Sequence, residues 1–328
     1  MEALLKKTFY LALLLVTMLS CGKVSSTRVV KLGHGLDVSH PVHKSMVYMA
    51  QQVEKESNGT LKIEIYPSQQ LGTERQLVEL LQIGSLGITK VSASVLENFA
   101  PSYKVFSIPF IFKTEQHRFN VLEGEIGLEI LKDGEEFWFH GLCFYDAGSR
   151  SFYTKDKPVY KPEDLEGQKI RVMESQTAMN MVRSLGGSPT PISFGELYTA
   201  LQQGVVDGAE NNPPSFYTSR HYEVSKYYTI DEHTAVPDVL IISTHVWSSL
   251  SPEHQQILQK AALESAEYQK KLWKEASDEA LTKVQEAGVE IIYPDKSAFQ
   301  GKVQELYKSY EKDPQMDQLI KRIQKVEG

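Results

Sequence analysis

The chain has 328 residues, of which 41% are hydrophobic and 23% are charged, a composition typical of a globular protein. Its formal charge of −7 argues against a nucleic-acid partner, because proteins that bind nucleic acids present a basic face. The sequence has two cysteines and no zinc-ligand spacing, and it lacks phosphate-binding glycine loops and the GxSxG motif of hydrolases. Neither a metal nor a cofactor is therefore predicted.

The N-terminus predicts export. Two lysines precede an apolar run at 9–19 that is too short to span a membrane comfortably. A serine then precedes Cys21, which suits cleavage at that point, so we predict a signal peptide over residues 1–20 and lipid attachment at Cys21. Residues 18 and 19 depart from the usual lipobox, which leaves an ordinary signal peptide as the alternative. If Cys21 carries lipid, Cys143 has no intramolecular partner and no disulfide forms.

Strand and helix patterns alternate after the leader. Alternating or β-branched apolar runs predict strands, and apolar residues at helical spacing predict helices. Thr73 and Gln76 form a capping box that opens the second helix. The expected elements are a strand at 28–33, a helix at 43–57, a strand at 61–66, a helix from 73 and a strand at 88–91. This order predicts a mostly parallel sheet with helical crossovers.

A similar alternation follows in the second half. Ser193 and Glu196 suggest another capping box, at the start of a helix that ends before Gly204. The expected strands lie at 137–144, 151–154, 170–173 and 239–243, with a short strand within 204–212 and a helix at 177–185. The longest helical pattern begins at Ser251-Pro252 and continues to Gly288. A strand at 289–293 and an amphipathic helical tail close the chain.

These elements predict an α/β protein with two lobes, because about three hundred residues exceed what one core usually fills. We assign 28–148 with 237–276 to lobe I and 149–236 with 277–328 to lobe II. The long helix is expected to lie along both lobes, and the chain crossings between them form a hinged cleft. In open α/β sheets, ligands bind at the carboxyl ends of the strands, so residues that follow strands are the site candidates.

Two arginines are the leading candidates. Arg171 stands inside an apolar strand, where a charge costs free energy unless a partner neutralises it. That partner is either Glu174 or another carboxylate of the protein, which makes the pair structural, or a ligand carboxylate bound in the cleft through two parallel N–H···O bonds. Arg150 follows a predicted strand and is a second candidate.

Amide and aromatic side chains supply further candidates. Asn211 and Asn212 precede two prolines that stiffen the backbone, and their amides suit ligand hydroxyls. The structural alternative for them is a turn built from Asn and Pro. Phe194 and Tyr217 offer flat faces for a sugar ring, although aromatic residues more often fill the core.

Four ionisable residues complete the set. Glu74 lies in the first turn of its helix, where negative charge is favoured, and its carboxylate also suits ligand hydroxyls. Lys90 and His40 lie near strand ends in the first half of the chain. His233 follows two acidic residues, so a paired or surface histidine is its structural alternative.

Several segments resemble the solute-binding proteins of TRAP (tripartite ATP-independent periplasmic) transporters. The most specific are GQKIRV (167–172) and GGSPTPISFGELYTALQQGVVDGAENN (186–212). Further matching segments are YPSQQLGTERQLVELLQIGSLGIT (66–89), SIPFIF (107–112) and LSPEHQQILQKAA (250–262). The resemblance spans essentially the mature chain. It implies a two-lobed fold of the periplasmic-binding-protein (Venus flytrap) type and a binding protein rather than an enzyme.

The resemblance also implies roles for individual residues. The arginine of the KIR motif, here Arg171, forms the main salt bridge to a ligand carboxylate in this family. Arg150 corresponds to a second anion contact of members that bind sialic acid, Asn211 assists it, and Phe194 packs on the ligand. Sialic-acid binders carry an acidic residue where this chain has Ser92, which counts against sialic acid.

The stretches at 40–46, 88–93 and 210–223 look most like members that bind hexuronates such as glucuronate or galacturonate. The predicted protein is therefore a periplasmic monomer that captures such an acid and docks on the small and large TRAP membrane subunits. Sialic acid, an aldonate, a C4-dicarboxylate or a 2-oxo acid are alternative ligands. A secreted enzyme acting on acidic sugars and a structural lipoprotein are the rival classes.

Overall fold

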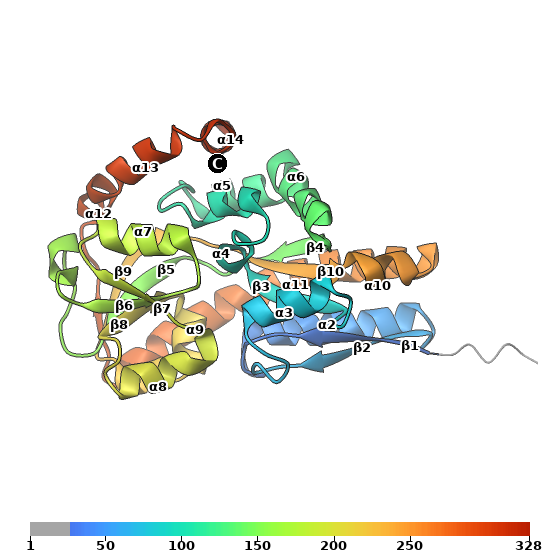
Figure 1. The fold of residues 1–328 in the computed structure, drawn as a ribbon. Coiled ribbons are helices and arrows are strands. Elements are labelled where there is room, and N and C mark those ends of the chain that lie inside the picture. Colours follow the sequence, from blue (N-terminus) through green and yellow to red (C-terminus); the bar gives the residue numbers. More distant parts are fainter. Residues whose placement is uncertain (1–26) are drawn as a thin grey trace, which may run out of the picture.

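A computed structural model describes residues 27–328 and contains two β-sheets (Figure 1). The predicted signal peptide and Cys21 lie outside the described residues. The first sheet has five strands in the order β2-β1-β3-β10-β4. Their bounds are β1 Arg28–Gly33, β2 Leu61–Tyr66, β3 Ile88–Ser92, β4 Phe139–Tyr145 and β10 Asp238–Ser243. We call this sheet and the helices packed around it the first lobe.

Helices surround the first sheet, and apolar side chains on their inner faces bury the sheet. On α2, for example, Met46, Met49 and Val53 recur at helical spacing and are fully buried. The helices are α2 Pro41–Glu56, α3 Glu74–Gln82, α4 Ala93–Leu96, α5 Glu115–Leu122, α6 Glu125–Asp133 and α10 Thr244–Ser249, with 3-10 turns η1 Pro101–Ser107 and η2 Gly134–Phe137. The capping box predicted at Thr73 and Gln76 is confirmed.

The second sheet has six strands in the order β11-β9-β5-β8-β6-β7. They are β5 Arg150–Thr154, β6 Lys169–Val172, β7 Ser188–Pro191, β8 Gly208–Asn211, β9 Tyr227–Thr234 and β11 Glu290–Ile292. The associated helices are α7 Gln176–Ser184, α8 Leu197–Gln202 and α9 Pro213–Thr218, with η3 Pro162–Leu165, η4 Phe194–Glu196 and η5 His221–Val224. This sheet and these helices form the second lobe.

The long helix is confirmed as α11, Pro252–Glu286, with 35 residues and an N-cap at Ser251. It packs against α2 and β4 of the first lobe and against α9 of the second. The tail forms α12 Lys296–Lys302, α13 Gln304–Tyr310 and α14 Pro314–Lys325. In Figure 1 these last helices run from the second lobe back toward α5 and α6. Contacts of α13 with α7 and of α14 with α6 therefore tie the two lobes together.

The two-lobed α/β architecture agrees with the prediction, but several local predictions were wrong. The parallel pairing predicted for the first three strands is confirmed, since β1 pairs with β2 and β3 in parallel. Both complete sheets are nevertheless mixed, because β10 runs antiparallel to both of its neighbours, and so does β5. The Ser193 hydroxyl donates to the Glu196 carboxylate at 2.6 Å instead of capping a backbone N–H. Arg150 begins β5 rather than following a strand. The lobe boundaries proposed from sequence stay a proposal, which the membership of the two sheets supports.

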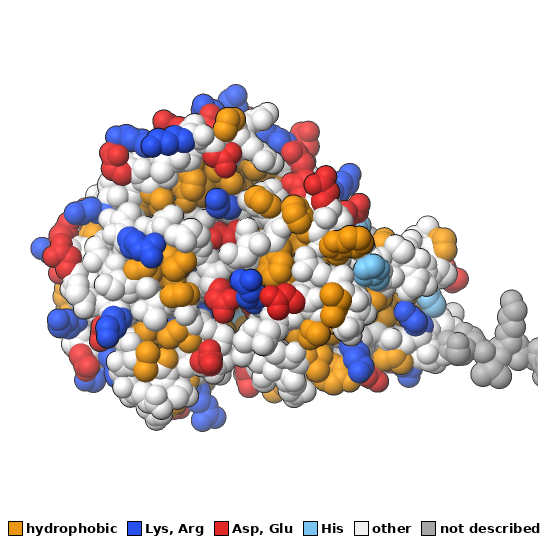
Figure 2. Space-filling view, in the orientation of Figure 1, with side chains coloured by type: hydrophobic (Ala, Val, Ile, Leu, Met, Phe, Trp, Pro, Cys, Tyr) orange, Lys and Arg blue, Asp and Glu red, His pale blue; other side chains and the backbone are white. Residues whose placement is uncertain are grey.

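The surface shows no broad basic area on the face in Figure 2, where acidic and basic side chains alternate. Within residues 27–328, no helix combines the length and the apolar character that crossing a bilayer requires.

Gly148 lies between β4 and β5, where the chain passes from one lobe to the other. Its φ of +56° is in the left-handed region, and an added Cβ would lie 2.8 Å from Trp273 Nε1 on α11. Gly167 has a φ of +76° but nothing within 4 Å of an added Cβ. An alanine there would have the same backbone strain as at Gly148 but no steric clash. We expect Gly148→Ala to lower the free energy of unfolding by about 1–3 kcal/mol more than Gly167→Ala in urea titrations. Equal losses would show that α11 yields to the added methyl group.

Candidate ligand-binding site

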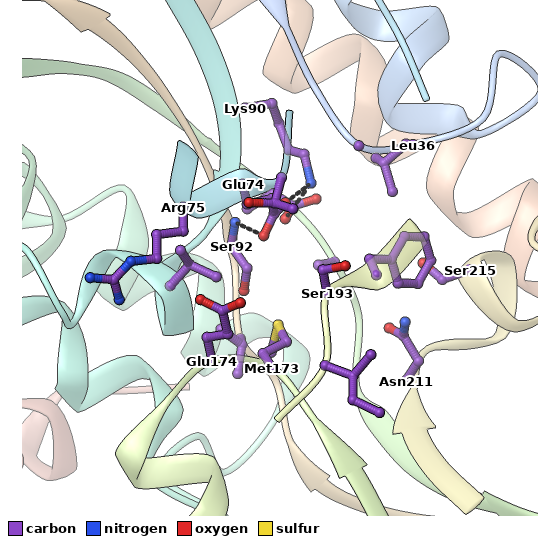
Figure 3. Close-up of a pocket in the computed structure, with 18 of the residues that line it drawn as sticks. Leu36, Glu74, Arg75, Lys90, Ser92, Met173, Glu174, Ser193, Asn211 and Ser215 are labelled. Carbon is purple, nitrogen blue, oxygen red and sulfur yellow. Dashed lines mark hydrogen bonds and ion pairs between the residues drawn. The ribbon is translucent and has the colours of Figure 1, made fainter. Parts of the chain in front are cut away.

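A cavity lies where the carboxyl ends of strands from the two sheets face each other (Figure 3). The first lobe lines it with residues after β1 and β2, on α3 and at the end of β3. The second lobe lines it with residues at the ends of β6, β7 and β8 and on α9. The lobes touch beside it, since Asn98 Nδ2 donates to the Glu174 carbonyl at 2.6 Å and Thr177 N donates to Glu97 Oε1 at 3.1 Å.

Arg171 lines this cavity from β6 and is 2% exposed. Its Nε donates to the Ile192 carbonyl at 2.8 Å, but Nη1 is buried without a hydrogen-bond partner. Glu174 lines the same cavity, but the predicted structural pair between it and Arg171 is not formed. No carboxylate within residues 27–328 makes a salt bridge with Arg171. Burial lowers the pKa of Arg171 because it desolvates the charged form, and the Glu210 and Glu74 carboxylates only partly offset this.

Arg150 also lines the cavity, but the protein itself neutralises it. Its Nε and Nη2 donate to the Glu210 carboxylate, and the Nη2–Oε1 distance is 2.9 Å. Nη2 also donates to the Glu210 carbonyl, and Nη1 donates to Asn211 Oδ1, both at 2.8 Å. Four of its five N–H groups therefore have protein acceptors. One N–H of Nη1 is left for a ligand.

His233 lies behind Arg150 and does not line the cavity. Its Nδ1 is 2.8 Å from Asp231 Oδ2, and its Nε2 is 3.6 Å from Glu210 Oε2. Burial alone would lower the pKa of His233, but the Asp231 and Glu210 carboxylates outweigh burial and raise it to about 9. This position favours the structural alternative given for His233, a paired histidine. It is fully buried and lies between the Asp231 and Glu210 carboxylates.

This pairing makes stability depend on pH. The pKa of His233 is about 9 in the folded protein against 6.5 for an unperturbed histidine, so its stabilisation is complete below pH 6.5 and is lost as the pH rises through 9. We expect the free energy of unfolding to fall by up to about 3 kcal/mol between pH 6.5 and 9. His233→Gln should flatten this slope in urea titrations over that range. An unchanged slope in the variant would assign the pH dependence to other groups.

Lys90 forms a second buried ion cluster on the opposite wall. Its Nζ is 3.0 Å from Glu74 Oε1 and 3.1 Å from Asp238 Oδ1, and Figure 3 shows the bonds from Glu74 to Lys90 and to the Ser92 amide. Burial would lower the pKa of Lys90, but the two carboxylates raise it. Burial raises the pKa of Asp238. The predicted candidates Glu74 and Lys90 thus both line the cavity, bound to each other.

Three of the four predicted amide and aromatic candidates line the cavity, and Tyr217 does not. Asn211, Asn212 and Phe194 line the cavity, and the Phe194 ring centroid lies 5.9 Å from the Arg171 Cζ. Asn211 Oδ1 accepts from Arg150, so its amide points into the cavity beside a cation (Figure 3). Asn212 is also the N-cap of α9, since its Oδ1 accepts from the Ser215 N–H at 2.8 Å. Asn212 therefore has the structural role of a helix cap and also forms part of the cavity wall.

His40 and Tyr217, which were predicted as ligand contacts, do not line this cavity. The Nδ1 of His40 accepts from Val42 N at the start of α2, so its Nε2 carries the proton and donates to Ser215 Oγ at 3.2 Å. Burial holds the pKa of His40 well below its usual value. Tyr217 stacks on Tyr222, with ring centroids 5.6 Å apart, and lines a separate surface hollow.

Several cavity residues were missed by the sequence reasoning. Most are polar side chains in loops or at the start of helices: Gln69, Thr73, Arg75, Ser193 and Ser215. The sixth is Asp238. Asp238 begins a strand rather than following one, because β10 runs antiparallel to β3. Gln69 follows β2, which was predicted, so the strand-end rule could have found it. Ser193 follows β7, which was not predicted.

Comparison with known proteins decides the family. Residues 32–313 match the family DctP, described as bacterial extracellular solute-binding protein, family 7. The chain belongs to this family. The resemblance to TRAP solute-binding proteins is thereby confirmed, and members of the family are binding proteins of transport systems.

Relatives within the family differ in what they bind. The chain is 42% identical over 288 residues to the uncharacterized protein YiiZ of Salmonella typhimurium, covering 87% of this chain and 88% of that protein. It is 31% identical to the C4-dicarboxylate-binding periplasmic protein DctP of Rhodobacter capsulatus, covering 82% of this chain and 81% of that one.

Solved structures of TRAP periplasmic solute-binding proteins share the fold. One from Xanthobacter autotrophicus with bound β-D-galacturonate has a TM-score of 0.88 at 38% identity, covering 91% of this chain and 100% of its own. One from Anaerococcus prevotii with bound α/β-D-glucuronate has a TM-score of 0.89 at 38% identity, covering 92% and 98%. A third, from Polaromonas, is bound to D-erythronate, with a TM-score of 0.89 at 30% identity and coverage of 92% and 99%.

Proposed function

We propose that this protein captures a hexuronate, D-galacturonate or D-glucuronate, in the cavity between its lobes and delivers it to the membrane subunits of a TRAP transporter. The observation that carries the proposal is Arg171, a buried guanidinium that lines the cavity and has no carboxylate partner in the described part of the chain. An unpaired buried cation is costly, and a ligand carboxylate removes that cost through charge-assisted hydrogen bonds. The solved relatives that bind these two acids support the choice of ligand.

The other polar groups favour an acid with one carboxylate and several hydroxyls. Arg150 is paired with Glu210, and Lys90 is paired with Glu74 and Asp238, so a second ligand carboxylate would find no free cation there. Hydroxyl groups can instead donate to the carboxylates and accept from amide donors such as Asn211. This argues against a C4-dicarboxylate, and an aldonate such as D-erythronate is the nearest alternative.

The charge pairing also favours binding over catalysis. Hydrolysis of acidic sugars requires one carboxylate as acid and another as base or nucleophile. Glu74 and Asp238 share Lys90, and Glu210 is paired with Arg150, so these three carboxylates are committed to ion pairs. Closure of the lobes removes water from the ligand and strengthens its bonds. The ligand shifts the equilibrium between open and closed forms by its greater affinity for the closed form.

Calorimetric titration tests this function. We expect D-galacturonate or D-glucuronate to bind and to raise the melting temperature, while D-galactose, which lacks the carboxylate, and succinate, which has two, do neither. The hexuronate should be recovered unchanged after denaturation. Tighter binding of succinate than of either hexuronate would overturn the assignment, and recovery of a converted product would support an enzyme.

The cellular setting completes the proposal. Family membership supports a periplasmic protein that acts with small and large TRAP membrane subunits. We further propose that Cys21 is the mature N-terminus and carries a lipid anchor. Mass spectrometry of the protein purified from membranes should then show a diacylated or triacylated Cys21, whereas an unmodified N-terminus would establish an ordinary signal peptide.

A further inference from the structure

The loop after β2 holds a glutamine in a rarely adopted backbone conformation beside the cavity. Ser68 and Gln69 have φ values of 54° and 59°, in the left-handed region that non-glycine residues seldom occupy. Ser68 N donates to the Leu36 carbonyl at 3.0 Å, and Gln69 N donates to the His34 carbonyl at 3.1 Å. These bonds fix the loop to the strand-end residues of β1. Such conformations persist where the surroundings impose them, and they cluster at ligand sites.

The side chain of Gln69 reaches the second lobe. An added Cβ on Gly195, in η4, would lie 2.4 Å from Gln69 Oε1 and 2.9 Å from its Cδ. On the other side, an added Cβ on Gly35 would lie 3.5 Å from Gln69 Cγ and from Nε2. The amide is therefore held between one glycine of each lobe. Its contact with Gly195 exists only when the second lobe has approached the first.

The amide also has an unused donor. Gln69 Nε2 is buried and makes no hydrogen bond within residues 27–328, although the side chain lines the same cavity as Arg171 and Phe194. A buried donor without an acceptor is costly, and native structures contain few of them. A ligand oxygen in the cavity would supply the acceptor.

We propose that Gln69 is a ligand-contacting residue that couples recognition to closure: its amide donates to a ligand hydroxyl or ring oxygen, and its contact with Gly195 forms as the lobes close. This inference rests on the proposed capture of a sugar acid in the cavity. The loop at 67–72 then contributes to ligand affinity. This contribution requires glycine at position 195, because a side chain there would displace the Gln69 amide.

A double-mutant cycle tests the coupling by calorimetric titration with D-galacturonate and D-glucuronate. Gln69→Asn shortens the side chain by one methylene and keeps a residue that tolerates the left-handed region. Gly195→Ala displaces the Gln69 amide from its site. We expect each variant to bind about tenfold more weakly, as the loss of one hydrogen bond predicts. The combined variant should bind no more weakly than Gln69→Asn alone, because both changes remove the same contact.

Matched controls come from the same chain. Gln70→Asn alters the exposed neighbour of Gln69, and Gly301→Ala adds a methyl group where nothing lies within 4 Å. Both control variants should bind the hexuronates with a Kd within twofold of the wild-type value. All variants should unfold cooperatively in urea, which shows that they are folded. Binding by Gln69→Asn within twofold of the wild type, or fully additive losses in the combined variant, would overturn the inference.

A cross-linking experiment separates this inference from the proposed function. Gln69→Cys combined with Gly195→Cys should be bridged by a short bifunctional thiol reagent, and faster when a hexuronate is present. This readout reports only whether the loop reaches the second lobe. Absence of cross-linking with and without either acid overturns the contact, whereas failure of both hexuronates to bind the wild-type protein overturns the proposed function.

Discussion

Replacing Arg171 with methionine is expected to weaken hexuronate binding by about 2–5 kcal/mol, which corresponds to roughly 30-fold to several-thousand-fold in Kd. Within residues 27–328 the buried Arg171 guanidinium makes no salt bridge, so its loss leaves the ligand carboxylate desolvated without a counter-charge. Calorimetry on the wild type and Arg171→Met measures the effect directly. Retention of the wild-type affinity by this variant would refute the proposed carboxylate contact.

The same substitution should affect stability in the opposite direction. In the ligand-free protein Arg171 is a buried charge without a carboxylate, and methionine fills a similar volume without that cost. The urea midpoint of Arg171→Met should therefore equal or exceed that of the wild type. Arg75→Met is the matched control, because Arg75 lines the cavity but is half exposed and pairs with Glu79 at 3.2 Å. Its effect on affinity should be small.

Glu210→Gln is expected to lower the free energy of unfolding by about 3–5 kcal/mol, which is typical when one partner of a buried ion pair is removed. Glu210 is 1% exposed and accepts hydrogen bonds from Arg150, and it also lies beside the charged His233. Burial would raise the pKa of Glu210, but these two cations lower it to about 2. The substitution leaves both cations in the interior without their shared anion.

An exposed pair provides the comparison for this second prediction. Glu305 and Lys308 form a salt bridge of 2.6 Å, but their side chains are 79% and 64% exposed. Glu305→Gln makes the same chemical change and should cost at most about 1 kcal/mol in urea titrations. Similar losses in the two variants would show that Arg150 and His233 find water or other acceptors when Glu210 loses its charge.

The sequence predicted the two lobes, the long helix and the position of the principal arginine because these features depend on local patterns. Strand-helix alternation, the N-cap Ser251 and the charge within an apolar strand are each visible over a few residues. β7 was missed because two prolines interrupt its four residues, and such a strand is tolerated only where it is found, at the edge of the sheet.

The partners of charged residues were harder to predict because they come from distant parts of the chain. Lys90 meets Asp238 only because β10 inserts beside β3, and the antiparallel direction of β10 was not visible in its apolar pattern. His40 and His233 were chosen as candidates because a histidine side chain can bind a ligand. Tertiary packing instead places His40 at the N-cap of α2 and His233 behind Arg150. The role proposed for Gln69 depends on a glycine of the other lobe.

The order of strands has a consequence for biosynthesis. The first sheet is completed only by β10, which ends at Ser243, and the second only by β11, which ends at Ile292. A nascent chain or truncated fragment that stops before Asp238 therefore contains neither sheet in full, and no single cut yields a half with a finished core. Pairing between such distant segments makes acquisition of the native state slow. We therefore expect the two sheets to be completed only after most of the chain has been synthesised.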